Sequence, residues 1–226
     1  MRVAVYHSNS DIRIEERPRP TAGPGELLVR VKASGVCGSD VMEWYRKLSA
    51  PRVLGHEVAG VVDSVGARVT RFAEGDLVFG TGHGTFAQYA RASEDRLAAV
   101  PTNLTMTEAG VLAVTGSTAL QAVEDHGRVR PGDQVLVLGA SGGVGTYAVQ
   151  IARSMGAHVT GVCSGRNVDM VKSIGADQVF NYREQDYTES GQTFDLVVDM
   201  VGNHSPLDNR QVLTPSGRLV VVGGKK

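Results

Sequence analysis

The stretch Gln134-Val-Leu-Val-Leu-Gly139-Ala-Ser-Gly-Gly-Val-Gly145, continued to Met155 and then by Gly156-Ala-His-Val-Thr-Gly-Val-Cys163-Ser164, decides the fold of this chain. It contains an apolar run, a glycine-dense turn, a segment with apolar residues at helical spacing, and a second apolar run. That order predicts a strand, a loop, a helix and a second strand. We therefore predict half of a dinucleotide-binding unit here.

The small residues of the turn have physical roles in such a unit. Ala140 and Gly142 let the backbone turn sharply and approach a pyrophosphate, and Gly145 removes a side chain where the helix meets the strand. The N–H groups at the start of the helix would then bind the anion. The residues of the turn that we predict to bind the cofactor are Ala140, Ser141, Gly142, Gly143, Val144 and Gly145.

The end of the second strand indicates which dinucleotide is bound. Enzymes that use NAD place an Asp or Glu about 20 residues after the glycines, where it binds the ribose hydroxyls. This chain has Cys163 there, followed by Ser164 and Arg166. Because no carboxylate repels a 2′-phosphate and Arg166 can pair with one, NADP(H) is favoured over NAD(H). We predict that Ser164 and Arg166 bind the cofactor.

Composition narrows the choice of partner and compartment. The 226 residues include 23 Lys plus Arg and 24 Asp plus Glu, so neither nucleic acid nor an anionic membrane is expected as a partner. The N-terminus lacks the apolar core of a signal peptide, and no apolar run could span a bilayer. Two cysteines give no disulfide framework. We expect a cytoplasmic protein that acts on a small molecule.

Two regions differ in their sequence pattern. The first hundred residues contain short alternating segments separated by turn signals, which predicts a small β-barrel or sandwich with strands that include 86–89. Thr105 and Glu108 then form a capping-box pattern for a helix, and a second helix is expected from about Ser117 to His126. From residue 134 onward, strands alternate with helices, which predicts a parallel, doubly wound sheet of five strands whose last strand covers 218–223. We place the boundary between domains 1–115 and 116–226.

A second cluster of reactive residues lies in the N-terminal half, within Gly35-Val-Cys-Gly-Ser-Asp40 and Gly55-His-Glu-Val-Ala-Gly60. Cys37, His56 and Glu57 are all zinc-ligand types, and a catalytic zinc needs three protein ligands plus water. Asp40 could fix the tautomer of His56, and Ser39 could pass a proton to or from a substrate oxygen. Zinc binding and ordinary core packing are about equally supported by this pattern.

These two motifs, together with the downstream Ala-Ser-Gly-Gly-Val-Gly turn, resemble the medium-chain dehydrogenase/reductase superfamily over essentially the whole chain. The superfamily includes zinc alcohol dehydrogenases and zinc-free quinone and enone reductases. The resemblance implies a GroES-like catalytic domain joined to a Rossmann domain, with the active site in the cleft between them. It also implies catalytic roles for Ser39, Asp40 and Glu57, zinc ligation by Cys37, His56 and Glu57, and cofactor binding by Thr118.

The chain departs from the zinc-dependent members in two places. The position of their third zinc ligand is occupied by Val114, which cannot bind metal. Either Glu57 completes the site, or His83 does, or there is no zinc. The lobe that holds a structural zinc in those members is replaced by the short link Gly80-Thr-Gly-His-Gly-Thr85. The link and the run from Gly116 to Ser205 resemble zinc-free quinone reductases.

A third departure is that the sixth strand of the Rossmann sheet, present in the family, is missing here. The fifth strand would be an exposed edge, so we expect a homo-oligomer to cover it. The leading hypothesis is an NADP(H)-dependent oxidoreductase that transfers hydride between nicotinamide and a carbonyl, alcohol, quinone or enone. The alternative is a non-catalytic nucleotide-binding or interaction protein derived from the same fold.

Overall fold

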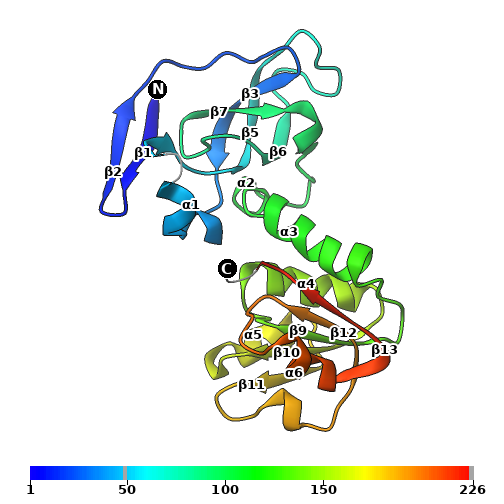
Figure 1. The fold of residues 1–226 in the computed structure, drawn as a ribbon. Helices are drawn as coiled ribbons and strands as arrows, with labels where there is room; N and C mark the ends of the chain where they lie inside the picture. Colours follow the sequence, from blue (N-terminus) through cyan, green and yellow to red (C-terminus); the bar gives the residue numbers. More distant parts are fainter. Residues whose placement is uncertain (48–49, 224–226) are drawn as a thin grey trace. The chain divides into compact units, whose positions relative to one another are not determined.

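The structure is a computed structural model that describes residues 1–47 and 50–223. The chain forms two compact units, Met1–Val114 and Thr115–Lys226, and each is considered by itself (Figure 1). Unit 1 contains the elements β1 (Arg2–Ser8), β2 (Asp11–Glu16), β3 (Glu26–Ala33), η1 (Gly38–Val41), α1 (Glu43–Lys47), β4 (Arg52–Val53), β5 (Glu57–Val65), β6 (Leu77–Thr81), β7 (Tyr89–Ser93), η2 (Glu94–Arg96), β8 (Leu97–Ala99) and α2 (Met106–Ala109). In the described part of the chain, no helix has both the length and the apolar character needed to cross a membrane.

Unit 1 is built on antiparallel strands. Five of them hydrogen-bond in the order β7-β3-β5-β6-β8, and three form a smaller sheet in the order β2-β1-β4. Alternating residues of the larger sheet point inward, as the period of two in the sequence predicts. Their side chains form one buried core of Leu27, Val29, Val58, Val62, Val78, Ala92 and Leu97.

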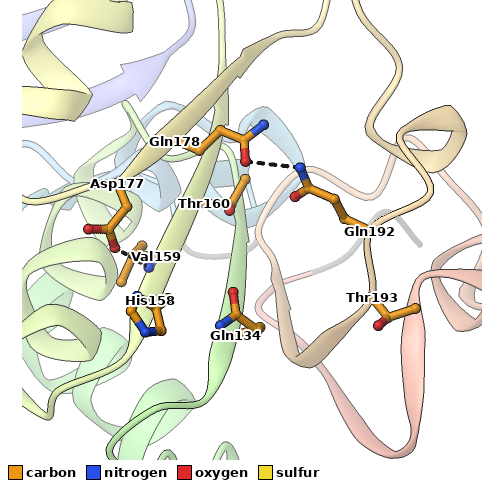
Figure 2. Close-up of a pocket in the computed structure, with 8 residues that line it drawn as sticks. All are labelled: Gln134, His158, Val159, Thr160, Asp177, Gln178, Gln192 and Thr193. Atoms are coloured by element: carbon orange, nitrogen blue, oxygen red, sulfur yellow. Dashed lines mark hydrogen bonds between the residues drawn. The ribbon is translucent and has the colours of Figure 1, made fainter.

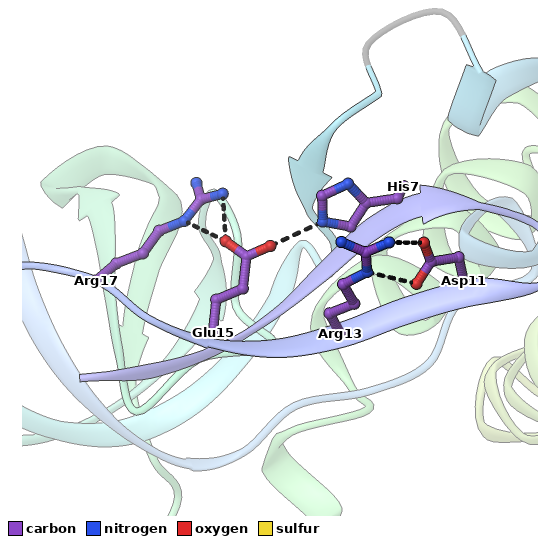
Figure 3. A network of polar contacts seen from close by, with 5 residues as sticks. All are labelled: His7, Asp11, Arg13, Glu15 and Arg17. Carbon is purple, nitrogen blue, oxygen red and sulfur yellow. Dashed lines mark hydrogen bonds and ion pairs between the residues drawn. The ribbon is translucent and has the colours of Figure 1, made fainter.

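The β1–β2 hairpin of the smaller sheet carries a surface network of charged side chains (Figure 3). His7 Nε2 lies 2.7 Å from Glu15 Oε1, and Arg17 donates to the other carboxylate oxygen at 3.0 Å. The hydrogen bond with His7 and, after it, the one from Arg17 lower the pKa of Glu15. Asp11 accepts two bonds from Arg13, at 2.9 and 2.6 Å. The contact with Glu15 gives His7 a structural role in the hairpin.

Unit 2 contains most of α3 (Ala113–Leu120), which begins in unit 1 and continues into a π-helical segment, η3 (Gln121–His126). Its other elements are β9 (Gln134–Leu138), α4 (Gly143–Ser154), β10 (His158–Cys163), η4 (Gly165–Asn167), α5 (Val168–Ser173), β11 (Gln178–Asn181), η5 (Tyr187–Glu189), β12 (Phe194–Asp199), α6 (Pro206–Gln211) and β13 (Leu213–Val221). The five strands are all parallel, in the order β11-β10-β9-β12-β13.

Both faces of the three inner strands β10, β9 and β12 are buried, which explains why these strands are apolar runs. Val135 and Val137 of β9 belong to a core that also contains residues of α3, α4 and α5. Leu136 and Leu138, which alternate with them, belong to a second core with residues such as Tyr187 of η5. The helices therefore cover the sheet on two sides, as a doubly wound fold requires.

Some predicted elements have different bounds in the structure. The strand expected at 86–89 is instead β7, which begins at Tyr89, because Arg30 and Glu26 of β3 pair with Tyr89 and Ser93. The last strand, expected at 218–223, begins at Leu213. The capping box of Thr105 and Glu108 is present, but α2 lasts only four residues. The second helix begins at Ala113, before the expected Ser117.

The second core contains a buried phenol, that of Tyr187. Tyr187 donates a 2.6 Å hydrogen bond to Asn209 Oδ1. Burial, reinforced by the negative charges of Asp199, Asp186 and Asp208, raises the pKa of Tyr187 above its ordinary value of 10.0. Stability from the neutral phenol is therefore complete below pH 10 and is lost as pH rises towards the higher folded-state pKa.

We expect the melting temperature of the wild-type protein to fall above about pH 10 more steeply than that of Tyr187→Phe. Tyr182→Phe is the matched control, because Tyr182 is 56% exposed and should leave the profile unchanged. Thermal unfolding followed by circular dichroism from about pH 8 to about pH 11 measures both. If Tyr187→Phe shows the wild-type decline, the phenol does not contribute this pH dependence.

Candidate functional site

The turn after β9 presents the start of a helix without a side-chain cap. Gly142 is the N-cap of α4 and its N–H donates to Gly139 O at 2.9 Å. Gly142 supplies no side-chain hydrogen bond to the start of α4, and the first N–H groups of a helix have no partner within the helix. These groups lie at the carboxyl end of the central strand β9, which is where doubly wound folds place the helix start that binds pyrophosphate.

The glycines of this turn fit the group that the sequence implies. A Cβ at Gly142 would meet only Gly139 O, at 3.3 Å, and one at Gly143 would meet only the Thr115 methyl group, at 3.3 Å. A Cβ at Gly145, by contrast, would collide with the backbone of Gly139. Gly145 thus brings the helix against the strand, while the first two glycines leave space above the N–H groups. This cradle suits a dinucleotide pyrophosphate.

The end of β10 has the composition predicted for an NADP(H) site. Cys163 is 2% exposed, and burial raises the pKa of its thiol, so it fills space as a neutral side chain. Ser164 is half-buried, and the exposed Arg166 lies in the single turn η4. Asn167 Nδ2 lies 3.1 Å from Ser141 Oγ and 3.2 Å from Ser164 Oγ, and so joins the glycine turn to the end of β10.

Asn167 was not among the predicted site residues, and only its position after Ser164 could have suggested it. Thr118 was among the predicted site residues. It is half-buried on α3, one helical turn after Thr115, whose methyl group lies beside Gly143. Its role in cofactor binding stays a prediction.

In unit 1 the structure brings three of the predicted residues together. Asp40, 5% exposed, accepts a 3.0 Å hydrogen bond from the Cys37 backbone N–H through Oδ2. Its other oxygen, Oδ1, lies 3.3 Å from His56 Nδ1. The carboxylate thereby orients the imidazole and leaves Nε2 as the ring nitrogen available to another group. Ser39 is half-buried in the same turn, η1.

The backbone around His56 is fixed by the link that follows β6. Gly55 has φ +88°, which only glycine adopts without strain, and its carbonyl accepts from Gly84 N–H at 3.1 Å and Thr85 N–H at 3.2 Å. Thr85 Oγ1 also lies 2.9 Å from Ser34 Oγ, whose hydroxyl donates to Glu57 O at 2.8 Å. Thr85 is 1% exposed and Ser34 is half-buried. This hydroxyl pair, which sequence reasoning missed, links the segments that carry the two motifs.

The predicted zinc ligands Cys37, His56 and Glu57 are not arranged as a metal site among the described residues. Within residues 1–47 and 50–223, no three His, Cys, Asp or Glu side chains are arranged to hold a metal ion. Glu57 is 2% exposed and its carboxylate packs tightly against Gly35. His83 is exposed, and its backbone N–H donates to Arg91 O at 3.2 Å. Zinc ligation by Cys37, His56 and Glu57 therefore stays a prediction.

A pocket of about 540 Å³ lies at the end of the parallel sheet where its strands begin, opposite the end that carries the glycine turn (Figure 2). Gln134, His158 and Gln178, which line it, are the first residues of β9, β10 and β11. Cofactors of doubly wound sheets bind outside the carboxyl ends of the strands, where the glycine turn lies. This pocket is therefore distinct from the candidate cofactor site.

Comparison with known proteins assigns the chain to a class. Residues 23–102 match the alcohol dehydrogenase GroES-like domain, and residues 143–226 match the zinc-binding dehydrogenase family. The chain is 32% identical to human quinone oxidoreductase over 237 residues, which cover 98% of this chain and 70% of that protein. It is 36% identical to a trans-enoyl reductase of Aspergillus terreus over 199 residues, 80% of this chain and 56% of that protein.

Among solved structures, a mycobacterial protein complexed with NADPH superposes with a TM-score of 0.87 at 28% identity, covering 99% of this chain and 74% of that one. The chain spans about two thirds of the curated quinone oxidoreductases it matches, 66% of the mouse protein and 70% of the human one.

These matches define a two-domain fold, with a GroES-like domain followed by a dehydrogenase domain. This chain belongs to the medium-chain dehydrogenase/reductase superfamily. The predicted fold class, a GroES-like β-barrel domain plus a parallel Rossmann sheet, is confirmed.

Proposed function

We propose that this chain acts in the NADPH-dependent reduction of a quinone or an enone. The observation that carries the proposal is the uncapped start of α4 above a glycine cradle, combined with Arg166 and the lack of a carboxylate at the end of β10. When bound, NADPH supplies a hydride. The residues of unit 2 bind and orient it: the N–H groups of α4 hold the pyrophosphate, and Arg166 pairs with the 2′-phosphate.

Unit 1 supplies the polar groups for the substrate. Asp40 orients His56, and the half-buried Ser39 hydroxyl donates a hydrogen bond to the substrate oxygen. In the overall reaction, one hydride and one proton convert a quinone to a hydroquinone, or an enone to a saturated ketone, and leave NADP⁺. The names of the human and Aspergillus relatives support these two substrate classes, and the NADPH-bound relative supports the cofactor.

We also propose that the protein is a homo-oligomer in the cytoplasm. Within the described residues β13 is an edge strand, and Val221 at its end is 51% exposed. Such an edge favours association. Light scattering coupled to size-exclusion chromatography measures the mass; a monomer at all concentrations would argue against association.

The experiment that tests the function is a turnover assay with the purified protein. NADPH is mixed with para-benzoquinone or with an α,β-unsaturated ketone, and loss of NADPH absorbance is followed with and without a chelator. We expect enzyme-dependent NADPH oxidation that the chelator does not change. If NADPH binds but neither substrate class, nor an aldehyde, is reduced, the protein is a non-catalytic nucleotide-binding protein and the proposal is wrong.

Two single variants separate the metal-free reaction from the zinc route. We expect Ser39→Ala to lower kcat by on the order of a hundredfold, since a donor to a developing oxyanion contributes about that much. Cys37→Ala should leave turnover unchanged, because alanine keeps both backbone hydrogen bonds with Asp40: Cys37 N–H donates to Asp40 Oδ2 at 3.0 Å, and Asp40 N–H donates to Cys37 O at 2.9 Å. Steady-state kinetics and metal analysis of both variants are the measurements. Simultaneous loss of activity and of bound zinc in Cys37→Ala would favour the zinc route instead.

A further inference from the structure

A buried acid at the carboxyl end of β12 has no role in the site described so far. Asp199 is the last residue of that strand and is 2% exposed. Its Oδ2 accepts a 3.1 Å hydrogen bond from Asn209 Nδ2, and Asn209 Oδ1 in turn accepts the bond from Tyr187. Asn209 and Tyr187 are 1% and 4% exposed. Burying these three polar groups is costly unless each is hydrogen-bonded, and each one is.

The other oxygen of Asp199 fixes the backbone that follows the strand. Oδ1 accepts hydrogen bonds from the Val201 and Gly202 N–H groups, both at 2.9 Å. Gly202 has φ +66°, so the chain turns sharply at this point. A single buried carboxylate thus connects helix α6, through Asn209, to the loop after β12.

That loop rests on the glycine turn. A Cβ placed at Gly139 would come within 2.8 Å of Val201 Cγ2, so the valine lies directly over the first glycine of the turn. Gly139 has φ +83°, and its N–H donates to Val162 O at 3.1 Å. Val201 is 43% exposed, so burial alone does not hold it there. The two hydrogen bonds that Asp199 accepts hold the loop in place, at the end of the sheet where β12 pairs with β9 and where the proposed cofactor site lies.

We propose that Asp199 is a positioning residue for the cofactor: it holds Val201 over Gly139, so that the loop after β12 forms one wall of the dinucleotide site. The inference rests on the proposed NADPH site and adds a residue that does not touch the cofactor itself. It predicts that cofactor affinity depends on a hydrogen-bond network buried behind that wall.

The test is an NADPH fluorescence titration of four variants, each combined with a melting curve. Asp199→Ala removes the acceptor, Asp199→Asn keeps an oxygen for the two N–H groups, and Val201→Ala shortens only the exposed side chain. Asp195→Ala is the control. Asp195 lies near the opposite end of the same strand, where its carboxylate accepts from Gln134 N–H at 2.9 Å and from Thr214 Oγ1 at 3.1 Å.

We expect Asp199→Ala and Val201→Ala to raise the Kd for NADPH by roughly tenfold, the factor that about 1.4 kcal/mol produces. Asp199→Asn should recover most of the affinity. Asp195→Ala should melt at a lower temperature yet bind NADPH as the wild type does, which a purely structural role for Asp199 would not explain.

Wild-type affinity in Val201→Ala overturns the proposal even if Asp199→Ala does not fold. Equal weakening in Asp195→Ala also overturns it, because loss of stability alone would then account for the effect. A wild-type protein that does not bind NADPH contradicts the proposed function as well, and so is distinguishable from a failure of the positioning role.

Discussion

Gly145→Ala should weaken NADPH binding by at least roughly tenfold, since it would cost at least one charge-assisted hydrogen bond worth about 1.5–3 kcal/mol. The added Cβ would collide with Gly139 O and come within 2.9 Å of Ala140 Cα. Both are backbone atoms, so the helix must move away from the strand. That movement displaces the N–H groups of α4 from the pyrophosphate, and overpacking also destabilises unit 2 by about 1–3 kcal/mol.

Gly143→Ala is the matched control for folding. It adds the same methyl group two residues earlier, where it would meet only the Thr115 methyl group at 3.3 Å. Alanine is also the better helix former by about 1 kcal/mol. We expect this variant to keep the wild-type melting temperature or to exceed it. Titration with NADPH and thermal unfolding of both variants test the argument, and a Gly145→Ala protein that melts and binds like the wild type contradicts it.

Arg166→Ala should weaken NADPH binding by roughly tenfold and leave NADH binding unchanged. A hydrogen-bonded pair with a charged group contributes about 1.5–3 kcal/mol, and the lower part of that range applies because Arg166 is exposed. NADH has no 2′-phosphate and therefore loses nothing. The ratio of the two dissociation constants, measured by fluorescence titration, isolates this contribution from any change in stability.

The control for Arg166 is Arg130→Ala. Arg130 is also exposed, but it lies in the turn before β9, at the amino edge of the sheet, so its removal changes the net charge equally without affecting the phosphate. Repeating the titrations at higher salt should reduce the effect of Arg166→Ala, because exposed charges are screened. If both variants lose the same affinity for NADPH, Arg166 has only a non-specific electrostatic role.

The cofactor half of the molecule could be predicted from the sequence because its signals are local. Strand β9, the glycine turn, helix α4 and strand β10 follow one another without interruption, and each has its own periodicity. The capping box at Thr105 is likewise contained in four residues. Asp40 and His56 are not adjacent in sequence, but their contact could be predicted from the glycine-flanked motifs and the family resemblance.

Contacts between distant segments were not predictable. Asp199, Asn209 and Tyr187 come from three separate elements, β12, α6 and η5, and only the folded chain makes them one network. The hydrogen bonds of Thr85 with Gly55 and Ser34 could not be predicted for the same reason, because they join segments that are distant in sequence. Strand β7 begins later than expected because its register is set by pairing with β3, and pairing partners cannot be read from one strand alone.

The most direct test of the central claim is a titration of the wild-type protein with NADPH and, separately, with NADH. The measurement needs no knowledge of the substrate and tests the glycine cradle, the start of α4 and Arg166 together. We predict saturable binding of NADPH with a clear preference over NADH. Binding of neither nucleotide would contradict the proposed cofactor site, and a preference for NADH would contradict the role of Arg166.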